Sequence, residues 1–256
     1  ATYPARKVPG VLISGFVAID LRRAVYPAAL FETLKQTHYR IDVDTRRARS
    51  DPEFLFDDLH ATLKARERVA NILWEAVDWD LFMIVITGTD RINHFLWKAY
   101  TDPNSKWHGD FIEYYKSVDG FVGRIYDRYL ELPGSRDQQN HFVMLSDHGF
   151  TEVRSEVYLN HWLQDNGFLS FEQDQPRSWD DIGSASKAFA LDPSRVYIHQ
   201  KGRYPRGSVS AGDVEKIKRE IRIGLQELTF ENGSPVLKKV VDREEVITGP
   251  CAGYGP

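Results

Sequence analysis

Two apolar runs of strand length constrain the fold of this chain most strongly: LFMIVIT at 81–87 and HFVMLSD at 141–147. The first run is apolar at consecutive positions, which is expected of a strand inside a sheet that helices cover on both faces. The second run is the next candidate for a buried strand. The segment between them, residues 110–131, has helical period. This alternation of buried strands and amphipathic helices predicts a layered α/β fold.

Further elements precede these two runs. Strands are predicted at 8–16 and 39–44. A long helix is predicted over 51–78, because Asp51 can cap its start and Pro52 suits its first turn. The first half of the chain therefore continues the α/β pattern.

The second half has a different character. Helices are predicted at 158–169 and 213–228, and two short strands are predicted on either side of a turn at Asp192. A polar stretch separates the first of these helices from the strands. We therefore expect a small inserted subdomain at 151–235, within one domain that spans residues 1–256.

Composition excludes several classes of function. The 33 basic and 37 acidic residues leave a formal charge of −4, which gives no reason to expect a nucleic acid polymer or an anionic membrane as partner. The single cysteine, Cys251, excludes an internal disulfide and a thiolate metal cluster. No stretch approaches the roughly 20 apolar residues of a membrane span, and the start lacks the apolar core of a signal peptide. We expect no membrane segment and a cytoplasmic location.

Asp90 and His94 follow the first apolar run and form the first candidate site. If this segment is helical, the four-residue step places both side chains on one face, where they can bind one metal ion. The alternative is structural: Asp90 would cap the helix, and His94 would pack beside Trp97. Both interpretations stay open from this spacing alone.

Asp147 and His148 follow the second run. Adjacent residues point in opposite directions along a strand, so both can face a metal only where the backbone turns, and Gly149 allows such a turn. The alternative is a simple turn in which Asp147 bonds its own backbone and His148 is exposed. Reactive groups gather at the carboxyl ends of strands in α/β proteins. The two strand ends together therefore predict two halves of one dinuclear metal site.

Weaker candidates lie elsewhere. Arg91 and Asn93 could contact a phosphate oxygen, or they could be solvated helix residues. His161 and His199 could supply a third imidazole, although an amphipathic segment and a short strand explain them better. The loop KGRYPRG at 201–207 has three cations and could hold an anionic substrate, but a solvated turn is the simpler interpretation.

Five stretches, in this order, carry a resemblance to a known family: WDLFMIVITGTDRINHFLW, HFVMLSDHGF, YLNHWLQDNGFL, YIHQKGRYPRGSV and VLKKVVDREEVITGP. The chain resembles the alkaline phosphatase superfamily, in its type I phosphodiesterase/nucleotide pyrophosphatase branch and the related phosphohydrolase/phosphomutase group. The resemblance implies a three-layer α/β/α fold with a mixed, largely parallel central sheet. It also implies two divalent metal ions, one bound by Asp90 and His94 and the other by Asp147 and His148. Carboxylate and imidazole ligands suit zinc first and manganese second.

The resemblance implies a metal-dependent hydrolase of small phosphorylated substrates, either phosphodiesters or nucleotide pyrophosphates. The family's Ser or Thr nucleophile and its remaining metal ligands have no matching segment, so the catalytic nucleophile is unassigned and the chain is expected to be incomplete at both ends. Two alternatives stay open: a phosphomutase of the same superfamily, and a degenerate, non-catalytic α/β domain that binds a phosphorylated ligand. The substrate and the oligomeric state stay open as well.

Overall fold

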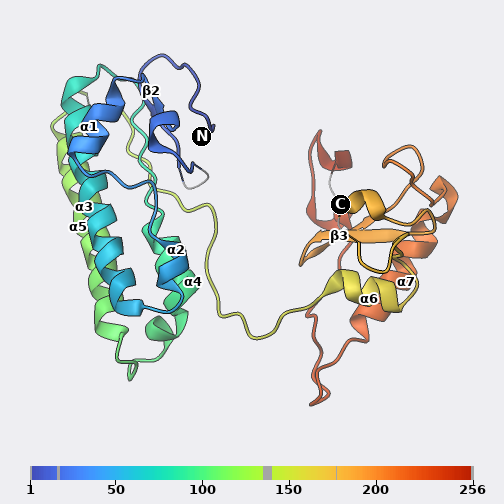
Figure 1. Ribbon diagram of the computed structural model, residues 1–256. Helices are drawn as coiled ribbons and strands as arrows, with labels where there is room; N and C mark the ends of the chain where they lie inside the picture. Colours follow the sequence, from blue (N-terminus) through green and yellow to red (C-terminus); the bar gives the residue numbers. More distant parts are fainter. Residues whose placement is uncertain (1, 16–17, 135–139, 177, 255–256) are drawn as a thin grey trace. The chain divides into compact units, whose positions relative to one another are not determined.

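The chain divides into two compact units. The computed structural model describes residues 2–15, 18–134, 140–176 and 178–254 (Figure 1). Unit 1 is Ala1–Glu152 and unit 2 is Val153–Pro256. The division falls next to residue 151, where the predicted insertion begins. That the second half is a subdomain inserted into one larger domain stays a prediction.

Three long helices dominate unit 1: α3 (Pro52–Ala76), α4 (Gly88–Thr101) and α5 (His108–Leu130). In unit 1, α3 and α5 lie side by side, and α4 contacts both (Figure 1). α3 begins as its sequence predicts, because the Asp51 side chain accepts a hydrogen bond of 3.0 Å from the Phe54 N–H and Pro52 occupies the first turn. The helices predicted at 51–78 and 110–131 are confirmed.

A buried core joins these three helices. Leu59 of α3, Ile92 of α4 and Phe111 of α5 have almost no exposed surface. Burying one side chain of this size contributes about 1.5–3 kcal/mol. The buried members of this core are Val43, Ala48, Leu55, Phe56, Leu59, Leu63, Ala70, Ile92, Ala99, Phe111, Tyr114, Phe121 and Ile125. The core therefore fixes α4, which carries the first pair of candidate ligands.

Smaller elements complete unit 1: the antiparallel pair β1 (Leu12–Ile13) and β2 (Val25–Tyr26), the 3-10 helix η1 (Leu21–Arg23), and the helices α1 (Leu30–Gln36) and α2 (Thr45–Ala48). The strand predicted at 8–16 is reduced to two residues, and residue 16 lies outside the described part. The strand predicted at 39–44 is wrong. Its last residue, Asp44, caps α2 by accepting hydrogen bonds from the Arg46 and Arg47 N–H groups, so the chain turns there instead of extending.

The predicted central sheet is not confirmed. Within the described residues the sheets are two small antiparallel pairs, and neither run 81–87 nor run 141–147 has a hydrogen-bonded partner strand. Run 81–87 nevertheless keeps a strand's alternation of faces: Phe82, Ile84 and Ile86 pack on the helical core, whereas Leu81, Met83 and Val85 point outward. The three-layer, largely parallel arrangement therefore stays unsupported, and the described fold is a mixed α/β one.

The outer side of these two runs is unusually apolar. Leu81 and Met83 are 82% and 77% exposed, and Val143, Met144 and Leu145 are each more than 70% exposed. The apolar residues on both faces of run 81–87 predict a strand in a sheet that helices cover on both faces. The described structure covers only one face of run 81–87. The sequence pattern thus indicates an extended conformation, but it does not indicate which neighbouring elements pack on each face.

Both runs extend in the same direction across the helices of unit 1. At their amino ends, Phe82 packs on Trp74 of α3 with ring centroids 5.1 Å apart, and Phe142 packs on Tyr129 of α5 at 5.6 Å. These two positions neighbour each other, because Arg128 lies 5.1 Å from the Trp74 ring. Because the two runs begin close together and cross the same helix pair, their carboxyl ends can also lie close together.

Unit 2 is built on a hairpin and two helices: β3 (Ala188–Asp192), β4 (Arg195–Ile198), α6 (Leu159–Asp165) and α7 (Val214–Gln226). The strands pair antiparallel, with Ala188 opposite Ile198. Asp192 forms the turn by accepting the Ser194 N–H at 2.9 Å, as the sequence predicts. Short helical pieces complete the unit: η2 (Trp179–Asp181), η3 (Ala211–Asp213), α8 (Arg243–Val246) and η4 (Ala252–Tyr254).

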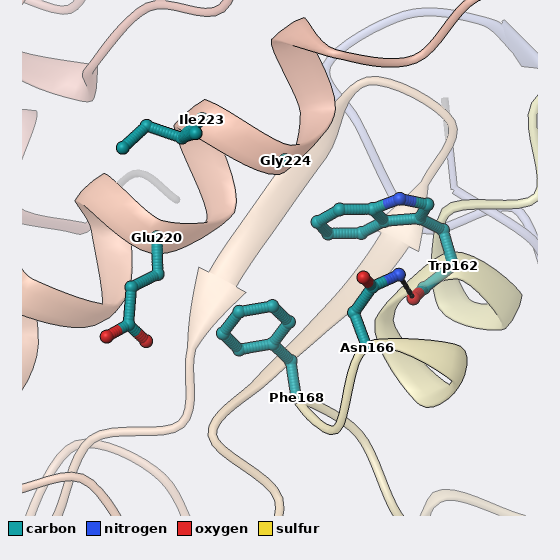
Figure 2. A pocket seen from close by; sticks show the side chains of 6 residues that line it. All are labelled: Trp162, Asn166, Phe168, Glu220, Ile223 and Gly224. Atoms are coloured by element: carbon teal, nitrogen blue, oxygen red, sulfur yellow. Dashed lines mark hydrogen bonds between the residues drawn. The ribbon is translucent and has the colours of Figure 1, made fainter.

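A shallow pocket of about 360 Å³ lies between α6 and α7 in unit 2 (Figure 2). The Trp162 and Phe168 rings are nearly parallel, with centroids 5.9 Å apart, and Asn166, Glu220 and Ile223 surround them. Gly224 lets α7 approach the indole closely, since a Cβ there would lie 2.7 Å from Trp162 Cζ2. The pocket contains none of the candidate ligands, so we treat it as a packing feature of this unit.

We expect Gly224→Ala to destabilise unit 2. Alanine stabilises a helix interior by about 1 kcal/mol relative to glycine, but the clash with the indole should cost about 1–3 kcal/mol. The net result should be a lower free energy of unfolding. Thermal unfolding followed by differential scanning calorimetry measures this loss, because the signals of six tryptophans would overlap in fluorescence. Gly212→Ala is the matched control in the same unit, because its nearest neighbour would be 3.9 Å away. A Gly224→Ala variant more stable than wild type would contradict the packing described.

Candidate functional site

Helix α4 places the first pair of candidate ligands. It begins at Gly88, which is buried against Tyr114 and Leu59. One turn later Asp90 and His94 lie on one face, with His94 Nε2 3.4 Å from Asp90 Oδ1. The residue before the helix is Thr87, and no side chain caps its amino end. The capping interpretation of Asp90 is therefore wrong, and the spacing produces the shared face that the sequence predicts.

His148 brings the second run to the same carboxylate. Its Nε2 lies 3.8 Å from Asp90 Oδ1 and 3.6 Å from Asp147 Oδ2. Two imidazoles from segments more than fifty residues apart thus face one oxygen of Asp90. All four predicted ligands, Asp90, His94, Asp147 and His148, belong to one cluster in unit 1.

The cluster contains nitrogen and oxygen donors of the types that bind zinc, but they do not surround a common point. Nitrogen and oxygen donors on one tetrahedral zinc ion lie about 3.3 Å apart, close to the distances at Asp90. In the part of the chain that the structure describes, no group of three or more His, Cys, Asp or Glu side chains converges on a point that could hold a metal ion. The donor types suit the ions that the sequence suggests.

An aromatic contact supports the two imidazoles. The Phe150 ring lies edge-on to the His94 ring, with centroids 4.9 Å apart, and its other neighbours are Trp97 at 5.4 Å and His148 at 6.5 Å. His94 and Trp97 therefore share a neighbour in Phe150, and a direct contact of His94 with Trp97 stays a prediction. This ring comes from the SDHGF segment and ties it to α4.

The turn at His148 is open to solvent. Its Nδ1 lies 2.9 Å from the Gly149 carbonyl oxygen, and the Ser146 hydroxyl donates to the His148 carbonyl at 2.6 Å. The Gly149 carbonyl, and after it the Asp147 carboxylate, raises the pKa of His148. Gly149 does not adopt a positive φ and has room for a Cβ, so the freedom of glycine is not what brings the side chains together.

Arg91 and Asn93 already have protein partners. Arg91 Nε donates to Asp42 Oδ2 at 2.9 Å, and its Nη1 donates to Asp90 Oδ2 at 3.1 Å. The Asn93 amide exchanges hydrogen bonds with the Tyr115 hydroxyl at 2.9 and 3.2 Å. Their predicted contact with a phosphate stays a prediction. Asp42 is the residue that the sequence missed, because an acidic residue in a predicted strand carries no local signal of a site.

The other candidates lie in unit 2, where local contacts account for them. His161 Nε2 is 3.7 Å from Asp165 Oδ2, one helical turn away. His199 is buried, and its two ring nitrogens face the carbonyl oxygens of Ser186 and Pro205 at 2.9 and 3.0 Å. In the cationic loop 201–207, a guanidinium pairs with the carboxylate of Glu172. These contacts support the simpler structural interpretations.

The comparisons with known proteins identify the family. No helix of the described residues is long and apolar enough to cross a membrane. No curated protein matches the chain, and no solved structure does. Residues 18–252 match the family described as Type I phosphodiesterase / nucleotide pyrophosphatase, whose members generally depend on metal ions. Because this match covers most of the 256 residues, the chain belongs to the type I phosphodiesterase/nucleotide pyrophosphatase family, the branch of the alkaline phosphatase superfamily that its motifs resemble.

Proposed function

We propose that this chain contributes a two-metal site to the hydrolysis of phosphodiesters or nucleotide pyrophosphates. The observation that carries the proposal is the convergence of His94 and His148 on one oxygen of Asp90, from two segments distant in sequence. Convergence of this kind is expected at a functional centre. A helix cap or an isolated turn would need only one of these segments.

The charges of the site favour a metal-dependent reaction. Asp42 and Asp90 pair with the guanidinium of Arg91, and Asp147 adds a third carboxylate beside His148, so these four charged groups carry a net charge of −2 when the imidazoles are neutral. An anionic phosphodiester would be repelled by such a site. Cations are therefore needed before an anionic substrate can bind.

The residues present suit divalent ions of the zinc type. Asp90 with His94 would hold one ion, and Asp147 with His148 the other, with zinc preferred over manganese for this mixture of nitrogen and oxygen donors. When bound, such ions neutralise phosphate charge and activate an oxygen nucleophile. The protein's own part is to hold the carboxylates, orient the imidazoles and leave the site open on the solvent side, where His94, Asp147 and His148 are exposed.

Metal binding and a substrate screen test this proposal together. We expect the purified chain to bind Zn²⁺ or Mn²⁺ in calorimetric titration. A protein that joins this chain to the family's Ser or Thr nucleophile should hydrolyse bis(p-nitrophenyl) phosphate faster than p-nitrophenyl phosphate, and only when metal is present. Metal binding without hydrolysis of either ester or of a nucleotide pyrophosphate would favour the degenerate, non-catalytic alternative. Transfer of phosphate between two sugar hydroxyls without net hydrolysis would favour the phosphomutase.

A further inference from the structure

An ion-pair chain runs from Asp42 through Arg91 to Asp90. Arg91 directs Nε and one terminal nitrogen to Asp42 Oδ2, at 2.9 and 2.5 Å, and its other terminal nitrogen to Asp90 Oδ2, at 3.1 Å. The side chains of Arg91 and Asp42 are only 18% and 15% exposed. Charge-assisted bonds that are shielded from water in this way hold their geometry far better than surface ion pairs.

We propose that Asp42 and Arg91 are a positioning pair that fixes the orientation of the Asp90 carboxylate. Because Arg91 engages Oδ2, the other oxygen of Asp90 is directed to His94 and His148, at 3.4 and 3.8 Å. The inference rests on the proposed function for its purpose, metal binding. Ligating carboxylates need such hydrogen-bonded support to keep their orientation.

Asp42 is itself held from two directions. Its Oδ1 accepts the Val43 N–H at 2.9 Å, which leaves Oδ2 for Arg91. The flanking backbone is anchored on α3: Arg66 donates to the Ile41 carbonyl at 3.0 Å, and the Asp44 N–H donates to Asp58 Oδ2 at 2.7 Å.

Asp58 makes this anchor firm. It is only 3% exposed, and besides the Asp44 N–H it binds the Arg40 guanidinium. Moving segment 40–44 away would leave the buried Asp58 carboxylate without these partners, which strongly destabilises a fold. The segment therefore has little freedom to move. Arg91 and Asp42 thus link the Asp90 carboxylate to helix α3 and fix its position.

The guanidinium suits this role for a geometric reason. Its planar fork presents one edge to Asp42 and another nitrogen to Asp90, which the single ammonium of lysine cannot reproduce. The hydrogen bonds that Arg91 donates to Asp42 raise the pKa of Arg91 further, so the guanidinium stays charged. Arg91→Lys should therefore fail to restore the position of Asp90, although it keeps the charge.

Metal affinity of the folded variants is the first test. We expect Asp42→Asn, Arg91→Lys and Arg91→Met each to weaken Zn²⁺ or Mn²⁺ binding by about 10- to 100-fold in calorimetric titration. The double variant Asp42→Asn/Arg91→Met should lose no more than the worse single variant, because the pair acts as one unit. Glu67→Gln is the matched control, since it removes the partner of Arg124 in another interhelical ion pair of unit 1.

A second readout needs no metal. In the metal-free chain, the ring carbon–proton NMR signals of His94 and His148 should shift in Asp42→Asn and Arg91→Met but not in Glu67→Gln. If the wild-type chain binds no metal but the Asp42→Asn and Arg91→Met variants show these shifts, the proposed function is refuted and the positioning pair is kept. Unchanged ring signals and a metal affinity within twofold of wild type would overturn the positioning pair and leave the proposed function standing.

Discussion

Asp90→Asn is expected to lower metal-dependent phosphodiester hydrolysis by more than about 100-fold, beyond the loss expected of a residue that only supports a ligand. Among the residues that the structure describes, Asp90 is the one carboxylate that faces both His94 and His148, at 3.4 and 3.8 Å. Asparagine keeps its size but removes its charge, so the side chain becomes a weak ligand. Arg91 would also lose an ion-pair partner at 3.1 Å. Metal affinity and kcat/KM, measured on the same preparation, check this expectation.

The matched control is Asp127→Asn, which makes the same change at an exposed position on α5. It should leave both metal affinity and turnover at the wild-type level. The substitution Asp147→Asn tests the second segment. We expect a smaller effect because the Asp147 side chain is 85% exposed and lies near one imidazole, that of His148. If Asp90→Asn bound metal and turned over substrate like wild type, the cluster would not be the metal centre.

The helices could be predicted because their signals are local. The start of α3 follows from two adjacent residues, Asp51 and Pro52, and its apolar stripe continues through Leu55, Leu59 and Leu63. The turn at Asp192 follows in the same way from the side chain's hydrogen bond to the Ser194 N–H. The start of a helix and the position of a turn depend on a few neighbouring residues, so they can be predicted from one sequence.

The central sheet could not be predicted with the same success. Run 81–87 has the composition and the alternation of a strand, and its inward residues pack as expected. Strand pairing, however, depends on a second segment that one stretch of sequence does not specify. The exposed outer face, with Leu81 and Met83, shows where the local pattern and the described surroundings differ.

The site was predictable in position more than in detail. The four-residue spacing and the strand-end rule predicted that His94 and His148 lie near Asp90. They do, although the runs that lead to them are not paired strands in the described residues. Their role as metal ligands stays a prediction. The contact of Asp42 with Arg91 could not be predicted, because it spans 49 residues and depends on the path of segment 40–44 over α3.

Gly88→Ala is expected to destabilise unit 1 by about 3 kcal/mol, at the upper end of the usual cost of overpacking. A Cβ at this position would lie 1.8 Å from Tyr114 Oη and 3.2 Å from Leu59 Cδ2. Tyr114 and Leu59 are almost fully buried, so neither side chain can move aside freely. The start of α4 must shift instead. Because Asp90 lies two residues further on, metal affinity should fall together with stability.

Gly109→Ala is the matched control for this substitution. It is also a glycine in the first turn of a helix in unit 1, but a Cβ there would meet nothing within 4 Å. Its free energy of unfolding should stay the same or rise by up to about 1 kcal/mol. Adding Tyr114→Phe to Gly88→Ala removes the hydroxyl that a Cβ would strike and should restore part of both stability and metal affinity. A Gly88→Ala chain as stable as the control would mean that α4 is not held against Tyr114, and the position of Asp90 would then need another explanation.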